Sequence, residues 1–100
     1  MNFGLSEKTI QKLYSIFAKY PEVEEAIIYG SRAKGNYRES SDIDITLKGE
    51  ELNNEISSKI RQELENSNIP YLVDLSIYHH LQSDSLIEQI NKVGKILYKR

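Results

Sequence analysis

Residues 42–47 alternate strictly between polar and apolar side chains, and no other stretch constrains the fold as much. On an extended segment, successive side chains point to opposite faces. The apolar positions are Ile43, Ile45 and Leu47, and the polar positions are Asp42, Asp44 and Thr46. The pattern predicts a half-buried strand in a sheet that is packed on one face and carries two carboxylates on the other.

Helices and further strands are expected around this strand. Ser6 is placed to cap a first helix that ends at Pro21, and residues 23–29 form a short apolar segment typical of a buried strand. Apolar side chains recur at every fourth position within residues 51–67, which predicts a second helix with one buried face. These positions are Leu52, Ile56, Ile60 and Leu64.

The remaining segments complete the expected fold. Residues 71–78 alternate as a third strand, and a final helix ends near Gly94. Residues 32–41, with four charged residues and one glycine, form a loop or short helix, and residues 95–98 can add a terminal strand. We expect a single domain over residues 1–100 of the α/β class (α+β type), with a small mixed β-sheet packed against helices in the order αβαβαβα.

The composition excludes several classes of function. The chain has no cysteine, so disulfides and thiolate chemistry are excluded. A formal net charge of -2 gives no broad basic field that would hold long nucleic acid. The apolar runs are too short to span a bilayer, and the first residues lack the pattern of a signal peptide. We therefore expect a cytoplasmic protein that binds neither membranes nor long nucleic acid directly.

A cluster of basic residues near the C-terminus has two interpretations. Its members are Lys92, Lys95, Lys99 and Arg100. They can contact phosphates or an acidic partner, or they can be solvated cations at the end of a helix. The residues alone leave both interpretations open.

Three aspartates form the candidate metal site. Asp42 and Asp44 leave the same face of one strand with Cα atoms roughly 6.6 Å apart, so they can bind one ion between them. Asp74 lies in a strand that is otherwise apolar on both faces, and a carboxylate buried alone is costly. We therefore expect Asp74 to share a metal with the other two. Carboxylate oxygens are the ligands that Mg²⁺ prefers, and Mn²⁺ can replace it.

A phosphate-binding turn is expected where the first strand ends. Gly30 lets the backbone approach a phosphate, and exposed N–H groups together with the Ser31 hydroxyl can bind its oxygens. Arg32, Lys34 and Arg38 follow and can neutralise a triphosphate. The order of strand, turn and carboxylate-bearing strand brings a nucleotide and a metal to the same edge of the sheet.

Residues 30–35 and 41–44 together resemble the signature of the DNA polymerase β-like nucleotidyltransferases, and most closely their smallest branch, the minimal nucleotidyltransferase domains. This resemblance implies the nucleotidyltransferase fold and a role for Gly30 and Ser31 in holding the phosphates of an NTP. It also implies that Asp42 and Asp44 bind Mg²⁺, and that Asp74 is the third, catalytic carboxylate.

The resemblance also implies an activity. Minimal domains of this branch are similar to the antitoxin halves of two-protein modules, in which a helical HEPN protein is the toxin. The nucleotidyltransferase silences this toxin by adding AMP. Larger relatives carry a further domain that binds the acceptor, whereas little chain follows Asp74 here. We therefore expect transfer of AMP from ATP to a HEPN-type partner that supplies the acceptor side.

Two other functions remain open at this point. The chain can neutralise its partner by covering it, without catalysis, or it can transfer a nucleotide to a small molecule such as an aminoglycoside. Stoichiometry separates catalysis from covering, because a catalyst acts below one equivalent. A homo-oligomer is also possible.

Three further residues have two interpretations each. Adjacent side chains on an extended segment point to opposite sides, so His79 and His80 fit a loop or a partner contact better than a metal site. Tyr37 can stack on a nucleobase or can be an exposed loop residue.

Overall fold

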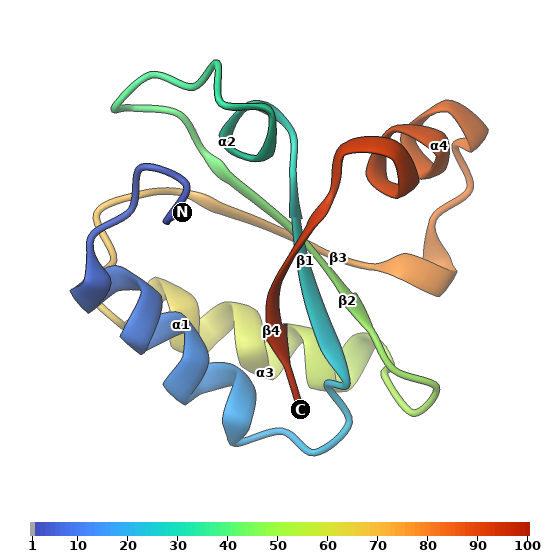
Figure 1. Ribbon diagram of the computed structural model, residues 1–100. Helices are drawn as coiled ribbons and strands as arrows, with labels where there is room; N and C mark the ends of the chain where they lie inside the picture. The colour runs from blue at the N-terminus through green and yellow to red at the C-terminus, as the bar shows by residue number, and fades with distance from the viewer. Residues whose placement is uncertain (1) are drawn as a thin grey trace.

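A four-stranded sheet organises the fold in this computed structural model, which describes residues 2–100 (Figure 1). The strands are β1 (Glu25–Tyr29), β2 (Ile43–Lys48), β3 (Val73–Ile77) and β4 (Lys95–Lys99). They lie in the order β3-β2-β1-β4, with β2 parallel to β3 and with β1 antiparallel to both of its neighbours. The expected small mixed sheet is therefore confirmed, with β3 and β4 as its two edges.

Helices cover the two faces of the sheet unequally. The longer helices are α1 (Glu7–Ala18), α3 (Asn54–Glu65) and α4 (Asp84–Val93). The short ones are α2 (Ser31–Lys34) and the 3₁₀ helix η1 (Tyr78–His80). Figure 1 shows α1 and α3 together on one side of the sheet and α4 on the other. The order is αβαβαβαβ, because residues 95–99 add the terminal strand.

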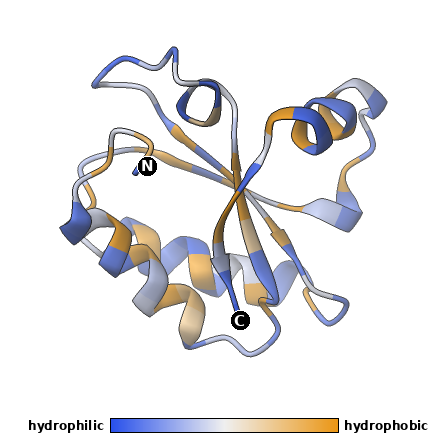
Figure 2. Cartoon of the chain, viewed as in Figure 1, coloured by the Kyte–Doolittle hydropathy of each residue, from blue (hydrophilic) through white to orange (hydrophobic). Residues whose placement is uncertain are grey.

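The alternation in β2 explains which face carries the main core. Ile43, Ile45 and Leu47 are fully buried, and they pack with residues of α1 and α3 in the larger of two apolar clusters. The smaller cluster lies under α4 and contains Ile27 and Tyr29 of β1. Figure 2 shows the hydrophobic residues along the strands and in bands on the helices, between hydrophilic ones.

Side-chain caps begin the three longer helices, as the sequence predicts for α1. The Ser6 hydroxyl accepts a hydrogen bond from the Thr9 N–H, and the Asn53 and Ser83 side chains cap α3 and α4 in the same way. Each cap satisfies an N–H group that has no partner within its helix. No helix within residues 2–100 is both long and apolar enough to cross a membrane.

The expected burial of Asp74 is wrong, although Leu75 and Ile77 of the same strand are buried. Asp74 is exposed, and the preceding Leu72 has 70% of its surface accessible, because β3 is an edge strand rather than a central one. Burial therefore does not force Asp74 to share a metal. The case for Asp74 depends instead on its position beside β2.

Candidate active site

Three polar side chains form one row across the sheet at the ends of β1, β2 and β3. Tyr29 is the register partner of Asp44, and Asp44 is the register partner of Asp74. Neighbouring strands lie about 4.8 Å apart, so the two carboxylates leave the same face side by side. Asp42 lies two residues before Asp44, just before the start of β2, and is exposed. The structure therefore brings Asp44 and Asp74 together, on the face opposite the main core.

In the described part of the chain, no ion pair neutralises the negative charges of this row. Burial raises the pKa of the Asp44 carboxyl, and the charges of Asp74 and Asp42 raise it further. The ion pairs within residues 2–100 join Lys19 to Glu63, Lys59 to Glu55 and Lys99 to Glu25, and none of them involves these aspartates. The site is therefore one where a cation relieves repulsion between like charges.

Gly30 allows the β1–α2 turn to run directly against Asp44. Its backbone has φ 74° and ψ -153°, a conformation that residues with a side chain rarely adopt. A Cβ atom at this position would lie 2.4 Å from the Asp44 Oδ2 atom. Because glycine has no Cβ atom, it lets the turn lie this close to the Asp44 carboxylate.

Ser31 begins α2 immediately after this turn and is partly exposed. Among residues 31–35, helical hydrogen bonds start with the Lys34 N–H, which donates to the Gly30 carbonyl oxygen. The preceding N–H groups have no partner within this single turn of helix. The Ser31 hydroxyl and these N–H groups are suited to phosphate oxygens, and they begin two residues after Tyr29 of the Tyr29–Asp44–Asp74 row.

Arg32 has a structural role that differs from the expected phosphate contact. Its side chain is 1% exposed, and its guanidinium donates to the backbone carbonyl oxygens of Phe3, Glu39 and Ser41 at 2.9 to 3.1 Å. The rings of Tyr37 and Tyr71 flank the same group, with centroids at 5.1 and 4.6 Å. Because these contacts occupy the guanidinium, it holds the loop between α2 and β2 rather than facing a nucleotide.

The donor chemistry of the three aspartates fits Mg²⁺, but they do not form a ready-made metal site. Their oxygen atoms are hard ligands, and their mutual repulsion favours a bound cation. In the described part of the chain, however, no three acidic or histidine side chains converge as a metal-binding group. Exposed side chains such as Asp42 and Asp74 must therefore rotate to share an ion with Asp44, and their role as ligands stays a prediction.

Sequence reasoning placed Tyr29 in the core and missed its polar contacts. Its ring packs in the smaller apolar cluster, while its hydroxyl reaches the polar face. Burial raises the pKa of the Tyr29 hydroxyl, a hydrogen bond with Ser76 opposes the rise, and the charges of Asp74 and Asp44 add to it. The position of Tyr29 directly before Gly30, at the end of a strand, is the sequence signal that could have identified it.

The other candidate residues lie outside the Tyr29–Asp44–Asp74 row. Lys34, the last residue of α2, and Arg38, on the loop that follows, are both exposed. The Tyr37 ring packs against the Arg32 guanidinium, and this contact holds the ring within the loop. His79 and His80 lie in η1, directly after β3, with ring centroids 4.7 Å apart.

Comparison with known proteins identifies a family and several similar folds. The family model described as Polymerase beta, Nucleotidyltransferase matches residues 11–100. No curated protein is a significant match to the chain.

Several solved structures share the fold. A crystal structure of a toxin-antitoxin with AMP-PNP has 28% sequence identity and a TM-score of 0.70, covering 96% of this chain and 75% of that one. A mutant of the toxin-antitoxin MntA-HpeT has 28% identity and a TM-score of 0.68, covering 96% and 74%. A tri-AMPylated HEPN toxin in complex with an MNT antitoxin, from Shewanella oneidensis, has 21% identity and a TM-score of 0.69, covering 96% and 74%. At that identity, the last match shows the fold alone.

Proposed function

Because the match over residues 11–100 shows that this chain belongs to the Polymerase beta, Nucleotidyltransferase family, we propose that it transfers AMP from ATP to a hydroxyl group of a protein partner. The partner is a helical HEPN-type toxin, and both proteins act in the cytoplasm. Similarity to toxin-antitoxin structures, one of them with AMP-PNP, supports this choice of nucleotide and partner. The chain acts as a single domain, and the partner supplies the acceptor side.

One observation carries the proposal. Asp44 and Asp74 are register partners on parallel strands, next to the turn at Gly30 and Ser31, and no ion pair within residues 2–100 neutralises them. A triphosphate held by the turn therefore has its reacting phosphorus near two carboxylates. This arrangement suits nucleotidyl transfer, in which catalysis consists mainly of positioning and charge neutralisation.

The chain's own residues have distinct tasks in this reaction. The Ser31 hydroxyl and the free N–H groups of α2 donate to the β and γ phosphate oxygens and orient the triphosphate. Asp74 accepts the proton of the attacking hydroxyl, whose oxygen forms a bond to the α phosphorus. The bond from that phosphorus to the bridging oxygen breaks, and pyrophosphate leaves with the electron pair.

Asp42, Asp44 and Asp74 would hold the divalent cation that this family generally uses with an NTP, and Mg²⁺ or Mn²⁺ suits their oxygen ligands. When bound, the cation neutralises phosphate charge and favours the ionised form of Asp44. The exposed positions of Asp42 and Asp74 leave both carboxylates accessible from solvent.

Mass spectrometry of the intact partner tests this proposal. With the chain at a tenth of an equivalent, ATP and Mg²⁺ should increase the partner's mass by about 329 Da, or by multiples of it, for each AMP added. Asp74→Asn should reduce the rate by several orders of magnitude, because it removes the proton acceptor. Asp84→Asn, which alters an exposed aspartate at the start of α4, is the matched control and should retain the rate.

Neutralisation by binding alone is the second candidate. Leu72 and Ile96 are 70% and 54% exposed next to opposite edges of the sheet, and apolar side chains of this kind favour contact with a partner. Full suppression of the toxin by Asp74→Asn, with no change in the toxin's mass, would establish this alternative. Suppression by wild-type chain far below one equivalent would contradict it.

A further inference from the structure

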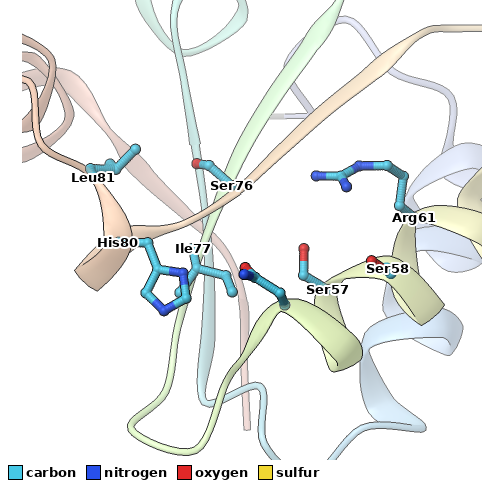
Figure 3. A pocket seen from close by; sticks show the side chains of 8 residues that line it. Ser57, Ser58, Arg61, Ser76, Ile77, His80 and Leu81 are labelled. Carbon is cyan, nitrogen blue, oxygen red and sulfur yellow. The ribbon is translucent and has the colours of Figure 1, made fainter.

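A polar hollow lies beside the outer edge of β3, which faces away from β2, and is bounded by α3 and η1. Its volume is about 270 Å³. It is lined by Asn54, Ser57, Ser58, Arg61, Ser76, Ile77, His80 and Leu81. Figure 3 shows Arg61 and His80 on opposite sides of this hollow, with Ser57 between them. No acidic side chain is among the lining residues, although the chain as a whole is negatively charged.

The Arg61 guanidinium of the hollow is available to a ligand. One nitrogen of Arg61, Nη2, donates to the Leu75 carbonyl oxygen at 2.9 Å, which fixes the side chain and leaves the other N–H groups of the guanidinium for an anion. None of the ion pairs within residues 2–100 involves Arg61 or His80. A positioned guanidinium without a carboxylate partner is the group that best recognises a phosphate.

A serine hydroxyl points into the same space. Ser57 lies on α3 and faces the hollow between Arg61 and His80. A hydroxyl can donate a hydrogen bond to an anion oxygen, so Ser57 can add one contact to those of Arg61. The start of α3 contributes a further preference for negative charge, because its first N–H groups point toward this end.

From these contacts we infer that the hollow bounded by Ser57, Arg61 and His80 binds a phosphate-type oxyanion. The site is separate from the turn at Gly30 and Ser31, because it is built from α3, the second half of β3 and η1. It connects to the polar face of the sheet through Ser76, whose hydroxyl donates to the Thr46 hydroxyl at 2.9 Å. The anion can be a free phosphate or pyrophosphate, or a phosphoester group on a larger molecule.

Titration with inorganic phosphate, followed by amide resonances in two-dimensional NMR spectra, tests the site. Saturable shifts are expected at Ser57, Ser58, Arg61 and His80, with a dissociation constant of roughly 1–10 mM. Shifts at Ser31 report the separate phosphate-binding turn and are fitted separately. An absence of saturable shifts at the four residues up to about 50 mM phosphate would overturn the inference.

Variants then identify the groups that hold the anion. Arg61→Gln should weaken binding about tenfold, and Ser57→Ala about threefold, each with an otherwise unchanged spectrum. Lys59→Gln removes the same charge from an exposed position on α3 outside the hollow and should leave the affinity within about twofold. Equal affinity in all three variants would also overturn the inference.

Two further ligands distinguish the source of the anion. Tighter binding of pyrophosphate than of AMP supports a site for a free oxyanion. Equal or tighter binding of AMP supports a site for a phosphoester group. Because neither measurement requires AMP transfer, the result does not depend on whether the proposed activity is present.

Discussion

The α-carbon of Gly30 faces the Asp44 carboxylate so closely that an added Cβ atom would lie 2.4 Å from Oδ2. The turn at Gly30 and the half-buried carboxylate of Asp44 are therefore in close contact. A side chain added at residue 30 would displace the carboxylate.

Gly30→Ala should damage both the turn and the carboxylate. The φ of 74° is unfavourable for alanine, and the new methyl group must push the end of the Asp44 side chain aside. We expect a loss of about 1–3 kcal/mol in the free energy of unfolding, measured by urea denaturation. Gly35→Ala, also at positive φ but with open space around it, is the matched control for backbone strain alone. Equal effects of the two variants on nucleotide transfer would contradict the proposed contact.

Arg32→Lys should destabilise the chain rather than selectively weaken nucleotide binding. A lysine ammonium cannot reproduce the hydrogen bonds that the buried guanidinium makes with the carbonyl oxygens of Phe3, Glu39 and Ser41. We expect a loss of about 2–4 kcal/mol in the free energy of unfolding, measured by urea denaturation. Arg38→Lys, an exposed substitution on the same loop, should change stability little. A stable Arg32→Lys variant with weakened ATP binding would instead support the expected contact between Arg32 and a phosphate.

Ser31→Ala should reduce transfer more than stability. The hydroxyl lies at the start of α2, where it is proposed to donate to a charged phosphate oxygen. Loss of such a bond costs about 1.5–3 kcal/mol in the transition state, or roughly ten- to 150-fold in rate. Single-turnover kinetics with the partner measures the rate, and thermal denaturation measures the stability. A wild-type rate would show that Ser31 serves only the turn.

The difference in stability between Asp44→Asn and the wild-type chain should depend on pH, and the variant should be the more stable of the two at neutral pH. Because burial and the neighbouring charges of Asp74 and Asp42 raise the pKa of Asp44 in the folded state, the folded chain binds this proton more tightly than the unfolded chain does. Wild-type stability is therefore lost as the pH rises through the raised pKa. The variant avoids this loss, so its melting temperature should be higher by a few degrees at pH 7 without divalent cations.

Two controls accompany this measurement. The stabilisation by Asp44→Asn should disappear below the ordinary carboxyl pKa of about 3.9, where the wild-type side chain is neutral in both states. Addition of Mg²⁺ at pH 7 should stabilise the wild-type chain and not the variant. An unchanged wild-type melting temperature in saturating Mg²⁺ would count against the metal role of Asp44.

The sequence predicted the parts of the fold that depend on local periodicity. Ile43, Ile45 and Leu47 alternate with polar residues over a full strand, so the strand and its buried face could be recognised without a partner strand. The cap at Ser6 was recognisable for the same reason, because capping depends on residues a few positions apart.

The errors concern relationships between distant segments. Leu72 and Val73 read as part of a strand buried on both faces, but the strand order puts β3 at an edge, and strand order is not encoded in local periodicity. Arg32 follows a phosphate-binding turn and resembles a phosphate ligand for that reason. Its burial depends on carbonyl groups of Phe3 and Ser41, which only the folded chain brings around it.

In the proposed reaction, the edge position of β3 gives the nucleotide and the acceptor hydroxyl separate routes to the Tyr29–Asp44–Asp74 row. Gly30 and Ser31 lie at the β1 side, whereas Asp74 is exposed on the outermost strand, with no further strand beyond it among residues 2–100. A macromolecule therefore does not have to enter a deep pocket to react. A hydroxyl on the surface of a folded protein can reach Asp74 without the unfolding of either protein.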